Sequence, residues 1–246
     1  MRSIAKLMKD WQFTGPNGVT TAVELPHTWN ARDGQDGGND YWRGCCTYCT
    51  RFAAPVYDPA QQQVWLQFEG VNASAAVLLN GQQLCTHDGG YSTFRAEVTE
   101  LLQAENQLTV RVDNSVNDRV YPQKADFTFY GGIYRDVSLL VVNKNHIALG
   151  HFGDTGVKIT PALQENSADI QVETLVEGEG TVAVELLDAE GRTVAKGEGE
   201  NAFLHLDAPH LWNGVKDPYL YTCVVRLLQD GQPVDEVTTR VGLRSF

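Results

Sequence analysis

Long apolar segments are missing from this sequence. No run approaches the roughly 18 consecutive apolar residues that cross a bilayer, so we expect no transmembrane helix. The N-terminal stretch MRSIAKLMKDWQF is interrupted by Arg2, Lys6 and Lys9, and no apolar core of a secretory signal follows it. We therefore expect a cytoplasmic protein with no membrane partner.

Positive charge is scarce. Nineteen Lys and Arg residues stand against 31 Asp and Glu residues, which gives a net charge of -12. An acidic surface repels phosphate backbones and anionic lipids, so nucleic acid is disfavoured as a partner while neutral ligands remain open. The 246 residues, 42% of them hydrophobic, suffice for one large or two modest domains with a buried core.

The chain has five cysteines, and an odd number does not suggest a disulfide framework. The spacing Cys46-x-x-Cys49 could suggest zinc, but no second such pair and no pair of histidines at ligand spacing completes a set of four. On a strand, Cys45 and Cys49 would point to one face and Cys46 to the other. We favour buried apolar thiols and expect no metal site.

Several catalytic signatures are also missing. A serine nucleophile elbow, a phosphate-binding loop and a dinucleotide fingerprint are absent, and no two acids stand out as the carboxylate pair of a glycosidase. The loop DGQDGGNDYWRG, Asp33 to Gly44, fails as an EF-hand at Gln35, Gly37 and Gly44, so a turn is favoured over a calcium site. From the residues alone we expect ligand binding at most.

Hydrophobicity with a period of two dominates the sequence and predicts an all-β fold. Asn80-Gly81 between two such runs predicts a type I′ hairpin. The predicted strands of the first half are Val64 to Phe68, Ala75 to Leu79, Gln82 to Cys85, Gln107 to Val112 and Ile133 to Val142, with a short helical turn in Val98 to Ala104.

A polar break at Asn143-Lys-Asn145 separates this half from a second series of strands. Those strands are predicted at Ile170 to Val176, Thr181 to Leu187, Thr193 to Lys196, Tyr219 to Leu228 and Val234 to Val241. About a hundred residues with this pattern fit an immunoglobulin-like sandwich. We therefore predict two β-sandwich domains in series, residues 1–143 and 144–246.

Several motifs resemble the N-terminal part of family 2 glycoside hydrolases, which include β-galactosidases, β-glucuronidases and β-mannosidases. The motifs that carry the resemblance are Leu25-Pro-His-Thr-Trp-Asn30, the DGQDGGNDYWRG loop, Gly89-Gly-Tyr91, Asp126 to Val137 with its block Gly131-Gly-Ile-Tyr-Arg-Asp136, Leu211-Trp212 with Asp217-Pro-Tyr-Leu-Tyr221, and Val241-Gly-Leu-Arg-Ser-Phe246. The resemblance covers nearly the whole chain.

The resemblance implies a galactose-binding-like jelly roll followed by an immunoglobulin-like domain. In the family a (β/α)8 barrel follows and carries both catalytic glutamates, so we expect none of them within these residues. The implied function is that of the non-catalytic region of a retaining glycosidase, most like a β-galactosidase, acting on a β-galactoside or related neutral glycan. Alternatives are a β-glucuronidase or β-mannosidase, a stand-alone carbohydrate-binding module, or a structural module of a homo-oligomer.

The resemblance also implies site residues. Asp126 would contact sugar hydroxyls, and in some relatives a monovalent cation, although a turn aspartate is the alternative. Phe127 and Tyr130 would line the same pocket or pack in the core.

Three further residues would support the loops of the pocket, namely Asp40, Arg43 and Arg135. We expect Arg43 to anchor its loop against the barrel and Arg135 to pair with Asp136. Some relatives place a sugar-binding asparagine where this chain has Cys45, so that contact is not expected here.

Overall fold

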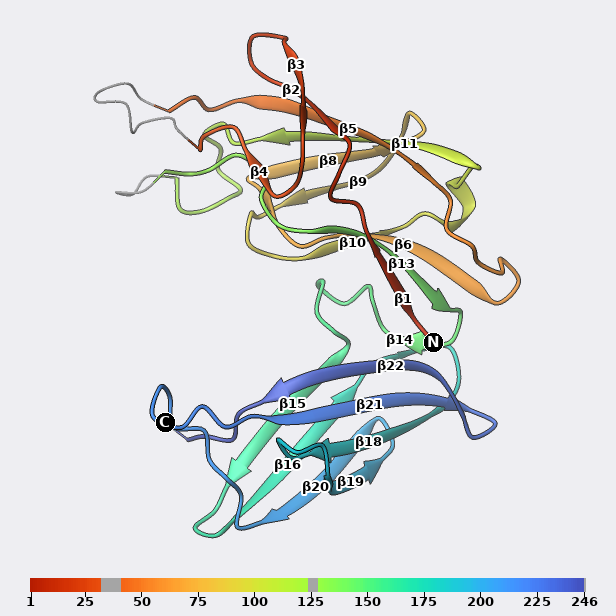
Figure 1. The fold of residues 1–246 in the computed structure, drawn as a ribbon, viewed down its shortest axis with the longest axis vertical. Coiled ribbons are helices and arrows are strands. Elements are labelled where there is room, and N and C mark those ends of the chain that lie inside the picture. Colours follow the sequence, from red (N-terminus) through yellow and green to blue (C-terminus); the bar gives the residue numbers. More distant parts are fainter. Residues whose placement is uncertain (32–40, 124–127, 246) are drawn as a thin grey trace. The chain divides into compact units, whose positions relative to one another are not determined.

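Two β-sandwich units, each with its own apolar core, make up the chain (Figure 1). The computed structural model describes residues 1–31, 41–123 and 128–245. One unit, here called the jelly-roll unit, is Ser3–Val141, and the C-terminal unit is Val142–Phe246 together with Met1–Arg2. The predicted all-β class is confirmed. In the described ranges no helix is long and apolar enough to cross a membrane.

The jelly-roll unit has a six-stranded sheet, a four-stranded sheet and a small three-stranded sheet. The six-stranded sheet has the order β3 (Thr20–Val23), β2 (Trp11–Thr14), β5 (Cys45–Ala53), β11 (Glu105–Asp113), β8 (Ser74–Leu79) and β9 (Gln82–Asp88). The four-stranded sheet has the order β1 (Ser3–Lys6), β13 (Val137–Asn143), β6 (Gln62–Phe68) and β10 (Phe94–Glu97). The small sheet has the order β4 (His27–Thr28), β12 (Gly132–Ile133) and β7 (Val71–Asn72).

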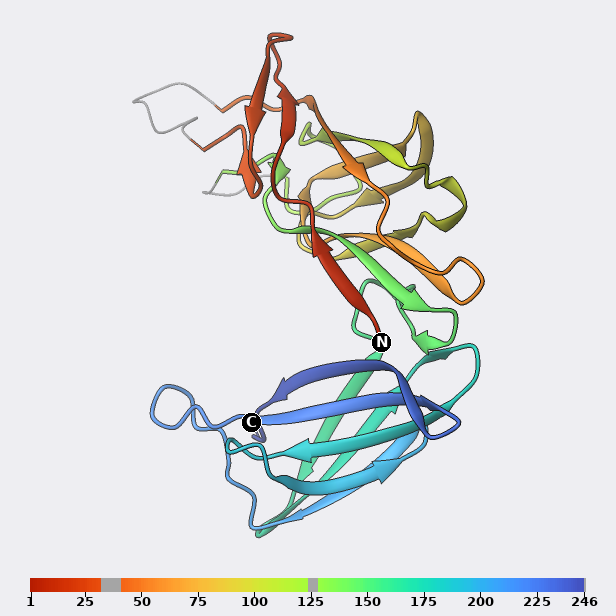
Figure 2. The ribbon, with the colours of Figure 1, turned by 45° about the vertical axis from the view of Figure 1, so that its right-hand side comes forward.

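The core of this unit lies between the inner faces of the two large sheets (Figure 2). Along β5 the side chains of Cys46, Tyr48 and Phe52 are buried while their neighbours face outward, as the period of two requires. Leu66 and Phe68 of β6, in the four-stranded sheet, are buried in the same core.

The Asn80-Gly81 turn and the short helical turn are confirmed. Asn80 and Gly81 have φ angles of 52° and 84°, the positive values that a type I′ hairpin needs. A 3-10 helix, η1 (Thr99–Leu101), lies inside the predicted helical turn.

The strand predicted from Ile133 to Val142 is wrong in one respect, because it is broken. Ile133 ends β12, which pairs with β4 and β7, and Val137 begins β13 in the four-stranded sheet. The chain changes sheets between these strands, and residues 134–136 leave the ladder.

The prediction of buried thiols holds for only part of the cysteine cluster. Cys46 is buried, but Cys49 is half-buried and Cys45 is exposed on the outer face of β5. The alternation of side chains between the two faces of the strand explains this difference, since an outward-facing side chain is exposed to solvent whatever the residue. No group of three or more metal-ligating side chains occurs among the residues that the structure describes.

The C-terminal unit is a second antiparallel sandwich. One sheet has the order β15 (Val157–Leu163), β16 (Ser167–Thr174) and β20 (Asn201–Asp207), and the other β19 (Thr193–Glu198), β18 (Thr181–Leu187), β21 (Tyr221–Gln229) and β22 (Gln232–Val241). β14 (His146–Ile147) and β17 (Val176–Glu177) form a short extra ladder. Alternate residues such as Ile170, Val184 and Leu227 fill the core, as their pattern predicts.

Candidate functional site

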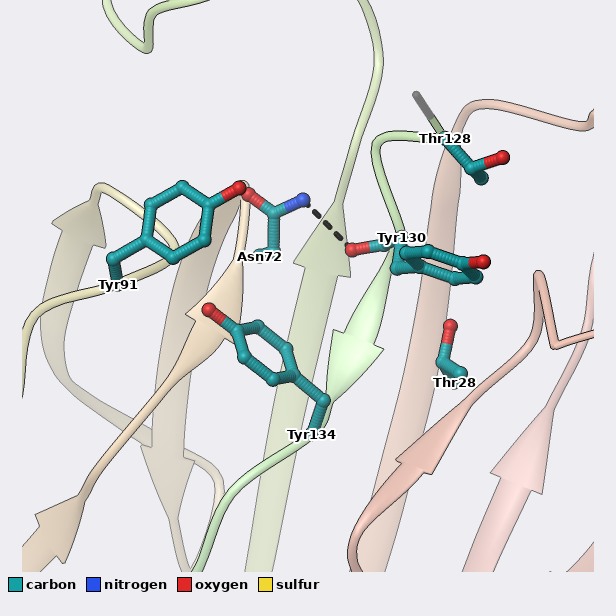
Figure 3. A pocket seen from close by; sticks show the side chains of 6 residues that line it. All are labelled: Thr28, Asn72, Tyr91, Thr128, Tyr130 and Tyr134. Carbon is teal, nitrogen blue, oxygen red and sulfur yellow. Dashed lines mark hydrogen bonds between the residues drawn. The ribbon is translucent and has the colours of Figure 1, made fainter. Parts of the chain in front are cut away.

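A pocket of about 320 Å³ opens at the small sheet of the jelly-roll unit (Figure 3). We call it the tyrosine pocket. Its lining residues are Thr28, Asn72, Tyr91, Thr128, Tyr130 and Tyr134. They come from β4, from β7, from the segment after β9 and from both sides of β12.

The short strand β12 brings these distant segments together. Its Gly132 lies opposite Thr28 of β4 on one side and Asn72 of β7 on the other. The Asn72 side chain donates a hydrogen bond of 2.7 Å to the carbonyl oxygen of Tyr130, drawn as the dashed line in Figure 3. The Thr28 hydroxyl donates one of 2.7 Å to the carbonyl of Gly131.

Close packing explains the two glycines before Ile133. A Cβ atom on Gly131 would overlap the indole of Trp29. Gly132 has a φ of 139°, and a Cβ there would overlap the carbonyl oxygen of His27. Because only glycine fits both places, the Gly131-Gly132 pair fixes where Tyr130 and Tyr134 project.

The tyrosines present both ring faces and hydroxyl groups to the pocket. Tyr134 donates its hydroxyl hydrogen to the carbonyl of Gly90, and its ring meets that of Tyr91 edge to face with centroids 6.5 Å apart. Burial raises the pKa of Tyr134, so its hydroxyl stays protonated at neutral pH. Tyr91 is 62% exposed and Tyr130 is 39% exposed, which leaves their rings open to a ligand.

Of the three residues expected to bind substrate, Tyr130 lies in this pocket. Asp126 and Phe127 lie outside the described residues, and so does the cation site expected near Asp126. They precede Thr128 and Tyr130 in the chain, both of which line the pocket. Asp40 also lies outside the described residues.

Arg43 joins the end of its loop to other segments of the jelly-roll unit. Its Nε donates to the carbonyl of Asn114 at 2.7 Å, and its Nη2 donates to Oε1 of Gln123 at 3.0 Å. The guanidinium also lies 5.3 Å from the ring centroid of Phe129. These contacts link Arg43 to Asn114, Gln123 and Phe129 of the same unit.

Arg135 contacts Tyr91 and Tyr134 of the tyrosine pocket. Its Nη1 donates to the carbonyl oxygens of Glu69 and Tyr91 at 3.4 and 3.3 Å, and its guanidinium lies 5.6 Å from the ring centroid of Tyr134. Asp136 forms its ion pair with Lys6, at 2.6 Å, in place of the expected pair with Arg135. Arg135 therefore contacts two residues that line the pocket, Tyr91 and Tyr134.

Two buried asparagines tie the rim of the pocket together, and the sequence did not single out their role. Asn30 Oδ1 accepts hydrogen bonds from the Gly131 amide at 2.7 Å and from Asn114 Nδ2 at 3.2 Å. Asn114 also accepts from the Gly44 amide at 2.8 Å and donates to the Phe129 carbonyl at 3.1 Å. A buried amide needs all these partners, so the pair fixes four chain segments relative to one another.

The described lining of the tyrosine pocket has hydroxyl groups, one amide and aromatic faces, and it has no charged side chain. Such a surface can exchange hydrogen bonds with hydroxyl groups and pack against an apolar ring face. It therefore suits a neutral, hydroxyl-bearing ligand such as a sugar.

Two family models match the chain. The model "Glycosyl hydrolase 2 galactose-binding domain-like" matches residues 38–162, and the model "Glycosyl hydrolases family 2" matches residues 151–244. Together they extend over both units.

Individual curated proteins and solved structures that are similar to this chain agree with this result. A β-glucuronidase of Bacteroides fragilis is 33% identical over 98% of this chain, and the chain spans about 37% of that relative's length. The crystal structure of an FMN-binding β-glucuronidase from Facaelibacterium prausnitzii L2-6 is similar with a TM-score of 0.94 and 35% identity, over 100% of this chain and 40% of that one. A putative β-galactosidase from Bacteroides fragilis gives a TM-score of 0.90 and 35% identity, over 99% of this chain and 41% of that one.

Proposed function

This chain belongs to glycosyl hydrolase family 2, and from that premise we propose that it is the non-catalytic N-terminal region of a retaining β-glycosidase. In this proposal the jelly-roll unit forms one wall of the substrate pocket, and the C-terminal unit is a spacer before the catalytic domain. The similarity of both units to parts of longer glycosidases supports this assignment.

The reaction we propose is hydrolysis through a glycosyl-enzyme intermediate, which needs two carboxyl groups about 5 Å apart on rigid elements. We place both in a separate (β/α)8 barrel and assign no catalytic role to a glutamate of this chain. In this proposal the residues of this chain orient the sugar. Fixing the substrate before the chemical step lowers the activation barrier of hydrolysis.

The tyrosine pocket carries the proposal. It joins Tyr130 to Tyr91 and Tyr134, and its lining residue Thr128 follows Asp126 by two positions in the sequence. We propose that Asp126 accepts hydrogen bonds from sugar hydroxyls while the tyrosines contact the ring or the group bonded to it.

We propose a β-galactoside as the substrate class. The described lining has no cationic side chain that could pair with the carboxylate of a glucuronide. A β-glucuronide is the second candidate. It is favoured by the names of two relatives, the Bacteroides fragilis and Facaelibacterium prausnitzii L2-6 β-glucuronidases.

Turnover by the 246-residue chain tests the non-catalytic role. The purified chain is incubated with p-nitrophenyl β-galactoside and with p-nitrophenyl β-glucuronide, and nitrophenolate release is followed by absorbance. We expect no release above the uncatalysed rate with either substrate. Release that a substitution within this chain abolishes would show that a catalytic centre lies here, and it would overturn the proposal.

A stand-alone carbohydrate-binding module is the alternative, since a jelly roll can bind sugar without catalysis. Calorimetric titration of the chain with β-galactosides separates the two functions. Micromolar binding, about -8 kcal/mol, would favour the module. Millimolar binding, about -4 kcal/mol, fits one wall of a larger pocket.

A further inference from the structure

A second hollow, of about 400 Å³, lies on the outer face of the six-stranded sheet. We call it the sheet-face hollow. Its lining residues are Cys45, Ser74, Ala75, Ala76, Thr86, Asp88, Arg111, Asp113 and Arg119. None of them lines the tyrosine pocket. Arg119 follows β11, and the strands that carry the other lining residues, β5, β11, β8 and β9, are neighbours in Figure 1.

The strand register arranges these side chains in two rows. One row across the sheet is Cys45, Asp113, Ser74 and Asp88. The next row on the same face, two residues along each strand, is Thr47, Arg111, Ala76 and Thr86. The small side chains of Ala76 and Thr86 leave a depression next to the long side chain of Arg111.

Asp88 is held in place as an acceptor at one side of the hollow. Ser74 Oγ donates to its Oδ1 at 2.5 Å, and Arg119 Nε donates to its Oδ2 at 2.9 Å. The Ser74 hydrogen bond, with a further contribution from Arg119, lowers the pKa of Asp88 and keeps it ionised at neutral pH. Each carboxylate oxygen has two lone pairs, so both can accept a further hydrogen bond.

Arg111 supplies donors that the protein itself leaves unused. Among the described residues no hydrogen bond or ion pair engages its guanidinium, which carries five N–H groups in a fixed fork. Asp113 lies two residues along the same strand and on the same face. Its Oδ1 accepts a hydrogen bond from the Ser115 amide at 2.8 Å, which fixes the carboxylate.

The charges in the hollow balance. Two guanidinium groups, of Arg111 and Arg119, face two carboxylates, of Asp88 and Asp113. An anionic ligand would gain little here, and the net charge of -12 would repel it. Paired hydroxyl groups fit better, because each can donate to a carboxylate and accept from a guanidinium.

We propose that the sheet-face hollow binds a neutral polyhydroxylated ligand, a hexose unit of a glycan. Arg111 donates to its hydroxyl oxygens, and Asp88 accepts from its hydroxyl groups. This second site shares no lining residue with the tyrosine pocket, so it does not depend on the proposed glycosidase function.

Titration of the ¹⁵N-labelled 246-residue chain with lactose tests this site. We expect saturable shifts of the amide resonances of Ala76, Thr86 and Arg111, with a Kd of about 1 mM. Arg111→Gln should weaken binding about tenfold, because it removes a charge-assisted donor. Since Arg111 has no hydrogen-bond or ion-pair partner among the described residues, the variant should keep the fold, which its spectrum checks. Arg51→Gln is the matched control, because Arg51 is an exposed arginine of β5 on the same face of the six-stranded sheet as Arg111.

Three results would overturn the proposal. One is the absence of saturable shifts at the amides of Ala76, Thr86 and Arg111. If shifts occur only at the tyrosine pocket, this proposal fails while the proposed function stands. Another is binding that Arg111→Gln does not weaken. The third is binding of sodium glucuronate without binding of lactose, which would show an anion site.

Discussion

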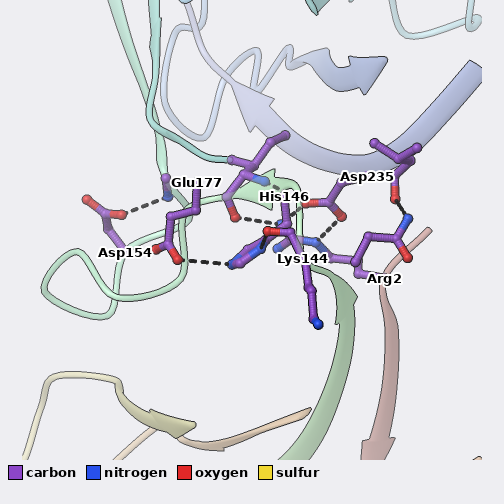
Figure 4. Close-up of polar contacts among 10 residues, drawn as sticks. Arg2, Lys144, His146, Asp154, Glu177 and Asp235 are labelled. Atoms are coloured by element: carbon purple, nitrogen blue, oxygen red, sulfur yellow. Dashed lines mark hydrogen bonds and ion pairs between the residues drawn. The ribbon is translucent and has the colours of Figure 1, made fainter. Parts of the chain in front are cut away.

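Replacement of Arg2 by Ala should strongly destabilise the C-terminal unit. The guanidinium of Arg2 forms a bidentate ion pair with Asp235, with Nε–Oδ1 and Nη2–Oδ2 distances of 2.7 and 2.5 Å (Figure 4). Asp235 Oδ2 also accepts the Ile147 amide hydrogen at 2.8 Å, and Arg2 Nη2 donates to the Ile147 carbonyl at 3.1 Å. The second residue of the chain thus completes a cluster in a sandwich that otherwise begins at Val142.

The burial of Asp235 sets the size of the effect. Its side chain is 0% exposed, so removal of the arginine leaves a carboxylate out of water with one backbone hydrogen bond. Breaking such a pair costs about 3–5 kcal/mol. The Arg2 side chain is itself 15% exposed, and water can enter the space that it leaves, so we expect the lower end, about 3 kcal/mol. At a urea m-value of about 1.5 kcal/mol per molar, the unfolding midpoint falls by about 2 M.

Unfolding has to be followed locally, because two units need not unfold together. Hydrogen exchange of the β21 peptide, Tyr221–Gln229, across a urea series reports on the centre of the C-terminal unit. Lys158→Ala is the control. It removes an exposed pair with Glu173 of 2.9 Å, and we expect a change below about 1 kcal/mol.

A double variant tests the reasoning further. Arg2→Met combined with Asp235→Leu removes both charges, and a buried pair replaced in this way often loses little stability. We therefore expect the double variant to be more stable than Arg2→Ala. If Arg2→Ala unfolds within about 0.5 kcal/mol of the unaltered chain, the ion pair does not stabilise the unit and the reasoning is refuted.

Three further predictions concern the jelly-roll unit and the thiols. Asn114→Ala leaves several buried groups unpaired, so calorimetry should show a loss of about 3 kcal/mol, or about 10 °C in Tm; an unchanged Tm contradicts this. Burial raises the pKa of Cys46 to about 12 and that of Cys223 to about 11, so iodoacetamide at about pH 8 should leave both unlabelled until urea is added, as mass spectrometry can show. Burial lowers the pKa of His27, so the unfolded state binds more protons below about pH 6.5. The stability should fall as the pH drops through that range, and His27→Gln should reduce the slope.

Strand patterns were readable from the sequence because they depend on neighbours along the chain. Thr181–Leu187 forms β18 with the predicted bounds, since alternate apolar residues need only a core on one side. The Asn80-Gly81 turn was readable for the same reason, as both residues tolerate positive φ. The break after Ile133 was not, because Ile133 and Val137 each suit a strand, and only pairing partners far along the chain place them in different sheets.

The site was readable only in part. Tyr130 was found through a family motif, but nothing local to Tyr91 or Tyr134 indicates that their rings meet. The Asn30–Asn114 hydrogen bond joins residues 84 positions apart, and an asparagine before a loop is ordinary turn chemistry in any sequence. Contacts of this kind depend on which strands become neighbours, and the period of two does not specify that.

The central claim is that the tyrosine pocket is a sugar-binding wall, and one titration tests it most directly. The ¹⁵N-labelled chain is titrated with p-nitrophenyl β-galactoside, and the amide resonances of Thr28, Asn72 and Tyr130 are followed. We predict saturable shifts at these residues and binding about three- to tenfold weaker in Tyr91→Ala, which loses an exposed ring worth about 1 kcal/mol. Resonances that stay unshifted in a folded chain, or binding that Tyr91→Ala leaves unchanged, would contradict the claim.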